Sequence, residues 1–336
     1  MTFDLIQTTA RYRSIISEIL GNLIPTGSEV ALFDFPNYSN VGDSMIWLGQ
    51  QRYLADVAKS RVRAVKDFSH GRPRFPRLDP EVTILLQGGG NTGDLWPQFQ
   101  EIRNHVIAEY PVNRIIQMPQ SIHFEDERRL EEVRRIYSGH SDFHFLARDS
   151  KSLTLSERLT DKPGILCPDM ALFLSPIKRT TEASEEIIAL LREDKEKNLA
   201  SRSTKDEGDL LAIDWIEEEV TPSMRIAAVI RRIQNKYEVN TRSLFQLKHL
   251  LYDRIANTRL RRGVTMLCEG KVVITDRLHA HLLCCLIGIP NVVLDNSYGK
   301  IFSLMDTWNT GEGISVKASS LKEAKERARE LLDKTG

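Results

Sequence analysis

Short apolar runs alternate with longer amphipathic segments along the first half of the chain. Six of these runs have the length and the Val, Ile, Leu and Phe content of buried strands, and the segments between them have helical periodicity. Strands that alternate with helices in this way are typical of a parallel sheet covered by helices. The expected strands are residues 30–35, 62–67, 82–86, 114–118, 143–147 and 165–167, and the expected helices are residues 43–58, 97–110, 125–138 and 150–160.

A second alternating set begins after residues 168–184, which carry two prolines and a small polar cluster and are expected to form a linker. Its strands are expected at residues 187–191, 210–213, 272–275 and 292–294, and its helices at residues 221–262 (two helices, broken near 237–241), 279–287 and 320–332. The pattern predicts an α/β fold of two Rossmann-like domains with a central cleft. The expected division is residues 1–175, residues 176–318 and a C-terminal helix over residues 319–336.

The charge of the chain is balanced, with 46 Lys and Arg against 46 Asp and Glu. Such a chain has no global field that attracts nucleic acid, so nucleic acid is not expected as a partner and any anion site must be local. The four cysteines form no C-x-x-C motif and are expected to be reduced packing residues, which fits the cytoplasm. No signal-peptide pattern and no run of 18 apolar residues is present. Peripheral contact with the inner face of a membrane and assembly into a homo-oligomer stay open.

Two loops of the first half place polar side chains and glycines at the carboxyl ends of predicted strands, where such folds bind ligands. The first loop contains Asn40 and Asp43. Asp43 is either the cap of the next helix or a carboxylate at the cleft, and both interpretations stay open. The second loop contains Gly89, Gly90 and Asn91, whose backbone can approach a ligand and present N–H groups to an anion. A close-packed turn would use the same glycines.

Later strand ends carry further candidates. Gln120 and Ser121 form a turn that resembles the glycine loop in position. Arg148 follows a predicted strand directly and can donate two hydrogen bonds to a carboxylate or a phosphate. A structural ion pair with Asp149 is the competing interpretation of this arginine.

Arg277 and His279 flank the start of a predicted helix, where the helix dipole adds to the attraction of an anion. A histidine beside a phosphate can hold a proton near neutral pH and donate it. His281 is expected on a different helix face, in the core. Because the two histidines are two residues apart on a helix, they cannot both reach one ion, and no metal site is predicted.

These loops together resemble the polysaccharide pyruvyl transferase family, in particular its bacterial exopolysaccharide members. The matching segments are N-V-G-D at 40–43, Q-G-G-G-N at 87–91, P-Q-S-I-H-F at 119–124, A-R-D-S at 147–150, C-P-D-M-A at 167–171, L-L-R-E-D-K-E at 190–196 and T-D-R-L-H-A-H at 275–281. No single segment is decisive, but their order and spacing are specific. The resemblance covers residues 30 to about 305.

The resemblance implies a domain arrangement like that of the GT-B glycosyltransferases, phosphoenolpyruvate as the donor and a sugar as the acceptor. It implies that Arg148, Arg277 and His279 lie at the donor. No cofactor is expected, because the sequence offers no plausible metal-ligand set and arginines are available to neutralise the phosphate. The acceptor is expected on a lipid-linked oligosaccharide. We also expect substrate contacts from the second half of the chain, where the candidates are Arg192, Asp194, Glu196, Asn296 and Lys300. The Arg-rich helical region at residues 217–263 departs from the family pattern.

The residues suit the implied chemistry. Phosphoenolpyruvate carries a carboxylate and a phosphate, so two or more cations should bind it. Transfer to a sugar diol needs an acid, for which we expect His279, and a base, for which we expect Asp43. Two alternatives are a GT-B glycosyltransferase that uses a nucleotide sugar and a scaffold subunit without catalysis. Phosphoenolpyruvate or UDP in a thermal-shift assay would separate the two enzymes, and a scaffold predicts a degenerate site.

Overall fold

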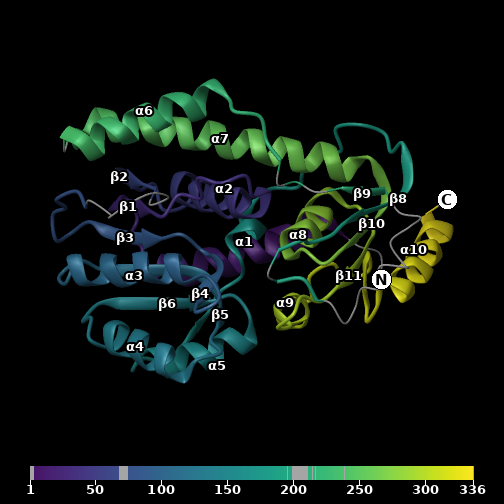
Figure 1. The fold of residues 1–336 in the computed structure, drawn as a ribbon, viewed down its shortest axis with the longest axis horizontal. Helices are drawn as coiled ribbons and strands as arrows, with labels where there is room; N and C mark the ends of the chain where they lie inside the picture. Colours follow the sequence, from purple (N-terminus) through teal and green to yellow (C-terminus); the bar gives the residue numbers. More distant parts are fainter. Residues whose placement is uncertain are drawn as a thin grey trace.

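The computed structural model describes residues 4–67, 75–194, 196–198, 211–213, 215, 217–237 and 239–335. Its first half forms a parallel sheet in the order β2-β1-β3-β5-β6-β7, with β4 paired to β5 (Figure 1). Neighbouring strands of this sheet run parallel because helices connect them. The strands are β1 Glu29–Phe33, β2 Arg61–Lys66, β3 Thr83–Leu86, β4 Gly89–Gly93, β5 Ile115–His123, β6 Phe143–Ala147 and β7 Ile165–Leu166.

A second parallel sheet, in the order β12-β11-β10-β8-β9, forms from the later part of the chain. The two sheets lie side by side in the molecule, the first within the larger body and the second near both chain ends (Figure 1). The strands of the second sheet are β8 Glu185–Leu190, β9 Leu211–Ile213, β10 Gly270–Thr275, β11 Asn291–Leu294 and β12 Ser315–Ala318. The predicted α/β class with parallel sheets is confirmed.

Helices cover both sheets and bury the apolar strand residues. Helices α2, α3, α4 and α5 follow strands of the first sheet, and α8, α9 and α10 belong to the second. Helix α1 contacts both η1 and α8, so it joins the two halves. The bounds are α1 Leu5–Gly21, α2 Val41–Asp56, α3 Pro97–Glu109, α4 Glu127–Ser138, α5 Ser150–Leu159, η1 Met170–Phe173, α8 Leu278–Ile287, α9 Lys300–Trp308 and α10 Leu321–Thr335.

The helical region between β9 and β10 lies mainly over the first sheet. Helix α6 (Pro222–Tyr237) packs along α7 (Arg242–Cys268), and α7 contacts α2 and β2 before it reaches α8 and β10 (Figure 1). The ring of Tyr252 stacks on Phe35 with centroids 3.8 Å apart, which fixes α7 to the first sheet. These helices therefore connect the halves in space, and the predicted domain division stays a prediction.

Most predicted elements are present, and the described residues form α1, β4, η1, α9 and β12 in addition. The predicted linker is only partly irregular, because the short 3-10 helix η1 lies within it and is buried. The predicted strand at residues 210–213 is β9 from Leu211 onward, and Leu210 lies outside the described residues. All four cysteines are free and buried, as expected.

Candidate active site

The carboxyl ends of both sheets face one pocket of about 450 Å³. A pocket of this size holds a small ligand and part of a second one. Strand β4 and the segments after β1, β4 and β6 line one side, and the segments after β8, β9, β10 and β11 line the other. Most of the predicted site residues line it: Asn40, Asp43, Gly90, Asn91, Arg148, Arg192, Asp194, Glu196, Arg277, His279 and Lys300. Gln120, Ser121 and Asn296 do not line it but form hydrogen bonds to residues that do. Gly89 does not line it either and precedes Gly90 in β4.

The first loop brings Asp43 to the pocket without using it as a helix cap. Asn40 is the N-cap of α2, because its side chain accepts a hydrogen bond from the Gly42 N–H at 2.8 Å. The interpretation of Asp43 as the cap is therefore wrong. Tyr38 donates a hydrogen bond to Asp43, and burial together with this carboxylate raises the pKa of Tyr38 well above its usual value.

Gly42 allows the two halves of the pocket to touch. A Cβ at Gly42 would lie 2.4 Å from Nδ1 of His279, so only glycine lets the imidazole lie against the start of α2. The N-termini of α2 and α8 therefore meet at this point, and His279 lies beside the loop that carries Asp43.

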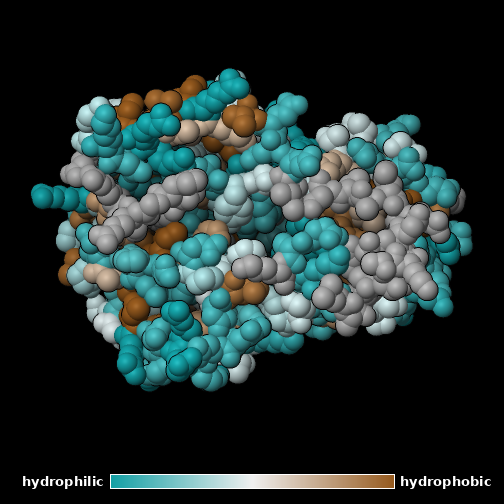
Figure 2. Space-filling view, in the orientation of Figure 1, coloured by the Kyte–Doolittle hydropathy of each residue, from teal (hydrophilic) through white to brown (hydrophobic). Residues whose placement is uncertain are grey.

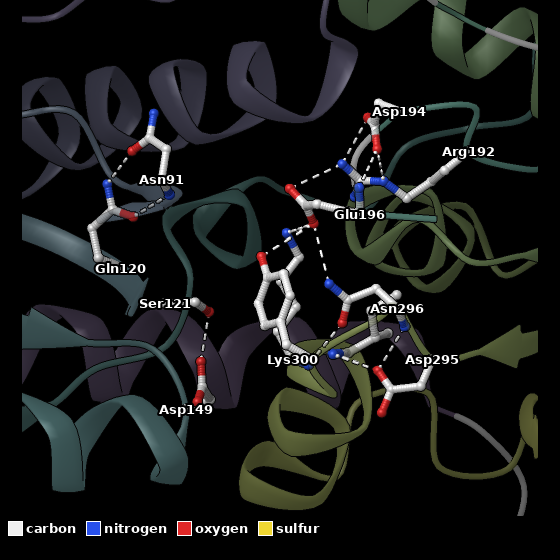
Figure 3. A network of polar contacts seen from close by, with 12 residues as sticks. Asn91, Gln120, Ser121, Asp149, Arg192, Asp194, Glu196, Asp295, Asn296 and Lys300 are labelled. Atoms are coloured by element: carbon white, nitrogen blue, oxygen red, sulfur yellow. Dashed lines mark hydrogen bonds and ion pairs between the residues drawn. The ribbon is translucent and has the colours of Figure 1, made fainter. Parts of the chain in front are cut away.

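The glycine loop makes room for cations. A Cβ at Gly90 would lie 2.6 Å from Nη2 of Arg148 and 3.2 Å from Nζ of Lys300. The loop is held from behind by Gln120, whose Oε1 accepts from the Asn91 N–H at 3.2 Å and whose Nε2 donates to Asn91 Oδ1 at 3.0 Å (Figure 3). Two cationic side chains thus converge over Gly90.

Arg148 and His279 share one carboxylate. Nη1 of Arg148 lies 2.7 Å from Oδ2 of Asp169, and Nε2 of His279 lies 3.3 Å from the same oxygen. Nε of Arg148 donates to Ser121 Oγ at 2.8 Å, and Asp149 accepts from Ser121 and caps α5. The competing interpretation, an Arg148–Asp149 ion pair, is therefore wrong.

Asp169 is the site residue that the sequence interpretation missed. It is fully buried. Burial alone would raise its pKa, but the charges and hydrogen bonds of His279 and Arg148 outweigh burial and hold the pKa of Asp169 well below its usual range. Its signal was its position directly after an apolar run in the C-P-D-M-A segment, which the two prolines of the expected linker obscured.

A second polar network lies across the pocket (Figure 3). Nε of Arg192 lies 2.9 Å from Oδ1 of Asp194, and its Nη2 lies 3.0 Å from Oε1 of Glu196. Glu196 also accepts from Lys300 and, at 3.2 Å, from the Asn296 amide. The L-L-R-E-D-K-E segment therefore holds two cations at the pocket, although its Lys195 lies outside the described residues.

The buried network shifts the pKa values of its members. Burial would raise the pKa of Glu196, but Lys300 and Arg192 lower it to about 2. Burial, supported by the nearby charges of Arg192 and Arg148, lowers the pKa of Lys300 to about 8 despite its carboxylate partner. Lys300 is therefore a cation that titrates close to physiological pH.

Aromatic side chains form another part of the pocket, which the sequence interpretation also missed. Tyr38, Trp96 and Phe99 are half-buried and line it from the loop after β1, the loop after β4 and the first turn of α3, respectively. Trp215 is buried on the other side, with the Arg277 guanidinium 6.0 Å from its ring centroid. The pocket thus has a cationic part and an aromatic part.

His281 lies away from the pocket, as predicted. It is buried between Asn291 Oδ1, 2.9 Å from Nδ1, and Thr310 Oγ1, 2.8 Å from Nε2. Burial lowers its pKa to about 4, so this ring is neutral. Across the described part of the chain, no group of three or more His, Cys, Asp or Glu side chains is arranged to hold a metal ion.

Comparison with known proteins decides the family. The sequence profile of the polysaccharide pyruvyl transferase family matches residues 40–298, which contain nearly all of the pocket residues. This chain belongs to the polysaccharide pyruvyl transferase family. As a family member it is a transferase that acts in pyruvyl transfer on polysaccharides.

Relatives agree with this assignment. The chain is 30% identical over 295 residues to the protein named pyruvyl transferase EpsO in Bacillus subtilis (strain 168), with 86% of this chain and 88% of that protein covered. It is 29% identical over 319 residues to Pyruvyl transferase 1 of Schizosaccharomyces pombe, with 88% of this chain and 74% of that protein covered.

A solved structure has a similar fold over nearly the whole length of this chain. An uncharacterised protein from Klebsiella pneumoniae superposes with a TM-score of 0.58 at 16% identity, over 95% of this chain and 100% of that one. That similarity concerns the fold alone. Among the helices of the described residues, none has the length and apolar character needed to cross a membrane.

Proposed function

We propose that this pyruvyl transferase moves the pyruvyl group of phosphoenolpyruvate onto two hydroxyls of a sugar in an exopolysaccharide precursor, forming a pyruvate ketal. The observation that carries the proposal is the convergence of four cationic side chains and a His–Asp pair on one pocket. The cations are Arg148, Arg192, Arg277 and Lys300. They complement a donor that bears both a carboxylate and a phosphate.

The donor is proposed to bind over Gly90. Nη2 of Arg148 and Nζ of Lys300 both approach this glycine, and Asp169 and Glu196 hold the two cations in place from behind. Cations that are oriented before the ligand arrives lose less side-chain entropy on binding. No metal or other cofactor is proposed to assist, because the arginines can neutralise the phosphate themselves.

His279 is proposed to protonate the methylene carbon of the donor. C2 then becomes electrophilic, a sugar hydroxyl adds to it, and Asp43 takes the proton of that hydroxyl. The C2–O bond to phosphate breaks with its electron pair on phosphate, and a second hydroxyl closes the ketal as its proton leaves with the phosphate. Asp43 then releases its proton to solvent and His279 takes one up from solvent, so the enzyme returns to its starting state.

The acceptor is proposed to lie against the aromatic part of the pocket. The faces of Tyr38, Trp96 and Phe99 offer apolar surface to the C–H groups of a sugar ring, beside the Asp43 carboxylate. We propose that residues 1–175 form the acceptor domain and that residues 176–318 form the domain with most of the donor contacts. This arrangement would resemble that of the GT-B glycosyltransferases, with residues 319–336 as a C-terminal helix. A cytoplasmic location and a lipid-linked acceptor complete the proposal.

The nucleotide-sugar alternative is less well supported. Its ribose would need a free acidic side chain in the second half, and the candidates were Asp194 and Glu196. Both carboxylates are engaged by Arg192, and Glu196 also by Lys300. The non-catalytic scaffold is disfavoured too, because the acid, base and cations are all at the pocket.

Two measurements test the proposal. In a thermal-shift assay phosphoenolpyruvate should raise the melting temperature and UDP should not, because a ligand stabilises only the state that it binds. Incubation with phosphoenolpyruvate and candidate lipid-linked oligosaccharides should then release phosphate and yield the ketal in mass spectra. Stabilisation by UDP together with glycosyl transfer from a nucleotide sugar would overturn the proposal.

A further inference from the structure

Helix α6 exposes an apolar stripe to solvent. Ile226, Val229, Ile233 and Tyr237 are 48%, 55%, 38% and 62% exposed. Their spacing of three, four and four residues places them on one face of a helix with 3.6 residues per turn. Hydrophobic side chains gather along the upper edge of the molecule, where α6 lies in Figure 1 (Figure 2). We call this stripe the α6 outer face.

The outer face is not needed to hold α6 on the protein. A separate stripe of Ala227, Ile230 and Gln234 is buried, and the first two of these belong to the core that includes α7 and the first sheet. Helix α7 adds two exposed leucines of its own, Leu247 at 45% and Leu250 at 59%. Exposed apolar side chains that share one helix face, as on α6, are more typical of an interaction site than of ordinary surface.

Basic side chains accompany the outer face. Residues 222–252 contain six Lys and Arg against a single acidic residue, Glu238, although the whole chain is electrically balanced. Glu238 lies outside the described residues. Arg225, Arg232 and Lys236 are exposed, and their spacing of seven and four residues forms a second stripe beside the apolar one. An apolar stripe bordered by Lys and Arg is typical of helices that lie in the interface of a membrane.

We propose that the α6 outer face docks on the surface of a lipid bilayer that contains anionic lipids. The apolar stripe would enter the boundary between head groups and acyl chains, while Arg225, Arg232 and Lys236 reach the lipid phosphates. A second copy of the chain is a poorer occupant. Symmetric packing of α6 on α6 would bring these basic stripes together, and like charges in an interface oppose association.

The docking helices are tied to the active-site loop. Nη1 of Arg259 donates to the Pro36 carbonyl at 2.7 Å, and Nη2 of Arg262 donates to the Ser39 carbonyl at 2.7 Å, both from the later turns of α7. Ser39 lines the pocket. If the acceptor is lipid-linked, as in the proposed function, docking would keep the enzyme at the surface that carries its acceptor.

Vesicle sedimentation tests the proposal without any substrate, so its outcome is independent of the proposed function. The full chain should sediment with vesicles of phosphatidylcholine and phosphatidylglycerol, and far less with phosphatidylcholine alone. The triple variant R225Q/R232Q/K236Q should lower the affinity for the mixed vesicles on the order of 100-fold, because each lost charge weakens binding about fivefold. The variant I226Q/V229Q/I233Q should abolish sedimentation.

Matched variants keep the test specific. R128Q/R129Q/R135Q removes three exposed charges from α4, and I6Q/V112Q removes exposed apolar side chains from other surfaces. Both should sediment like the original chain. The proposal is overturned if the chain ignores mixed vesicles, if the control variants lose binding equally, or if ultracentrifugation shows a dimer that I226Q/V229Q/I233Q dissociates without any effect of lipid.

Discussion

Asp169 determines how two of the predicted site residues are oriented. Its carboxylate holds both Arg148 and His279 while fully buried, so both lose a partner when the charge is removed. We predict that Asp169→Asn lowers turnover on the order of 10²-fold, since a displaced acid no longer meets its substrate. The affinity for phosphoenolpyruvate should fall as well. Steady-state kinetics and calorimetric titration measure the two effects.

A loss of fold has to be separated from a loss of orientation in this variant. Removing one member of a buried ion pair can cost about 3–5 kcal/mol of stability. Circular dichroism melting should therefore show a lower but still cooperative transition. Asp126→Asn, which removes the charge of the α4 N-cap outside the pocket but keeps a capping side chain, is the matched control and should keep full turnover. Normal turnover in Asp169→Asn would mean that Asp169 is only structural.

Lys300 should make donor affinity depend on pH. Burial lowers its pKa to about 8, so in the free enzyme its positive charge is present below that pH and is lost above it. The second ionisation of a phosphate ester is complete well below this range, with a pKa of about 6. The affinity for phosphoenolpyruvate should therefore fall as pH rises from 7 to 9.5, because Lys300 loses its positive charge over this range.

Lys300→Arg is the variant that isolates this effect, because arginine keeps its charge throughout this range. Its donor affinity should vary much less between these pH values than that of the original chain. Calorimetric titrations at several pH values measure both proteins. An equally steep fall in the arginine variant would assign the pH dependence to another group.

At the scale of elements, the meeting of α2 and α8 sets the position of His279. The Cβ of Gly42→Ala would lie 2.4 Å from the imidazole and must displace it. We predict a loss of turnover on the order of 10²-fold. Overpacking of this kind costs about 1–3 kcal/mol. The preference of helices for alanine over glycine offsets part of this cost, so the variant should still fold, with a modest drop in melting temperature.

Gly21→Ala is the control for this substitution. A Cβ at Gly21, the last residue of α1, meets nothing within 4 Å. Its kinetics should match those of the original chain. If Gly42→Ala also keeps normal turnover, His279 does not need its observed position, and its role as the acid loses support.

The elements that the sequence predicted are those whose cores are apolar and regular. Strands such as β3 and β6 and helices such as α4 and α10 follow from periodicity alone, because each strand buries an apolar run and each helix buries an apolar face. Position at strand ends then identified Arg148, Arg277 and His279 as pocket residues.

The missed elements lack such local signals. Strand β4 (Gly89–Gly93) consists largely of glycine and polar residues and forms because the long strand β5 offers it a partner. Helix α9 begins after Gly299, whose left-handed φ of 80° a pattern of polarity does not reveal. The aromatic part of the pocket was missed for a similar reason, since Tyr38 and Phe99 come together only after folding, with ring centroids 5.8 Å apart.

At the scale of the whole molecule, the pocket lies between two sheets and uses cations from both. We predict that turnover in EDTA equals turnover without it, because arginine and lysine side chains at the pocket can neutralise the donor phosphate. The assay follows phosphate release after dialysis against the chelator. Loss of activity that Mg²⁺ or Mn²⁺ restores would contradict this expectation.

Transfer in D₂O tests the central claim most directly, since it follows the proton that His279 is proposed to supply. A solvent-derived proton on the donor methylene carbon becomes part of a methyl group in the product. We predict a pyruvate ketal whose methyl group carries one deuterium from solvent. In His279→Ala, the rates of ketal formation and of deuterium incorporation should both fall by about 10²–10⁴-fold. Mass spectrometry and NMR of the product measure both. Deuterium entering at the normal rate in His279→Ala, or a ketal that forms without solvent deuterium, would contradict the account.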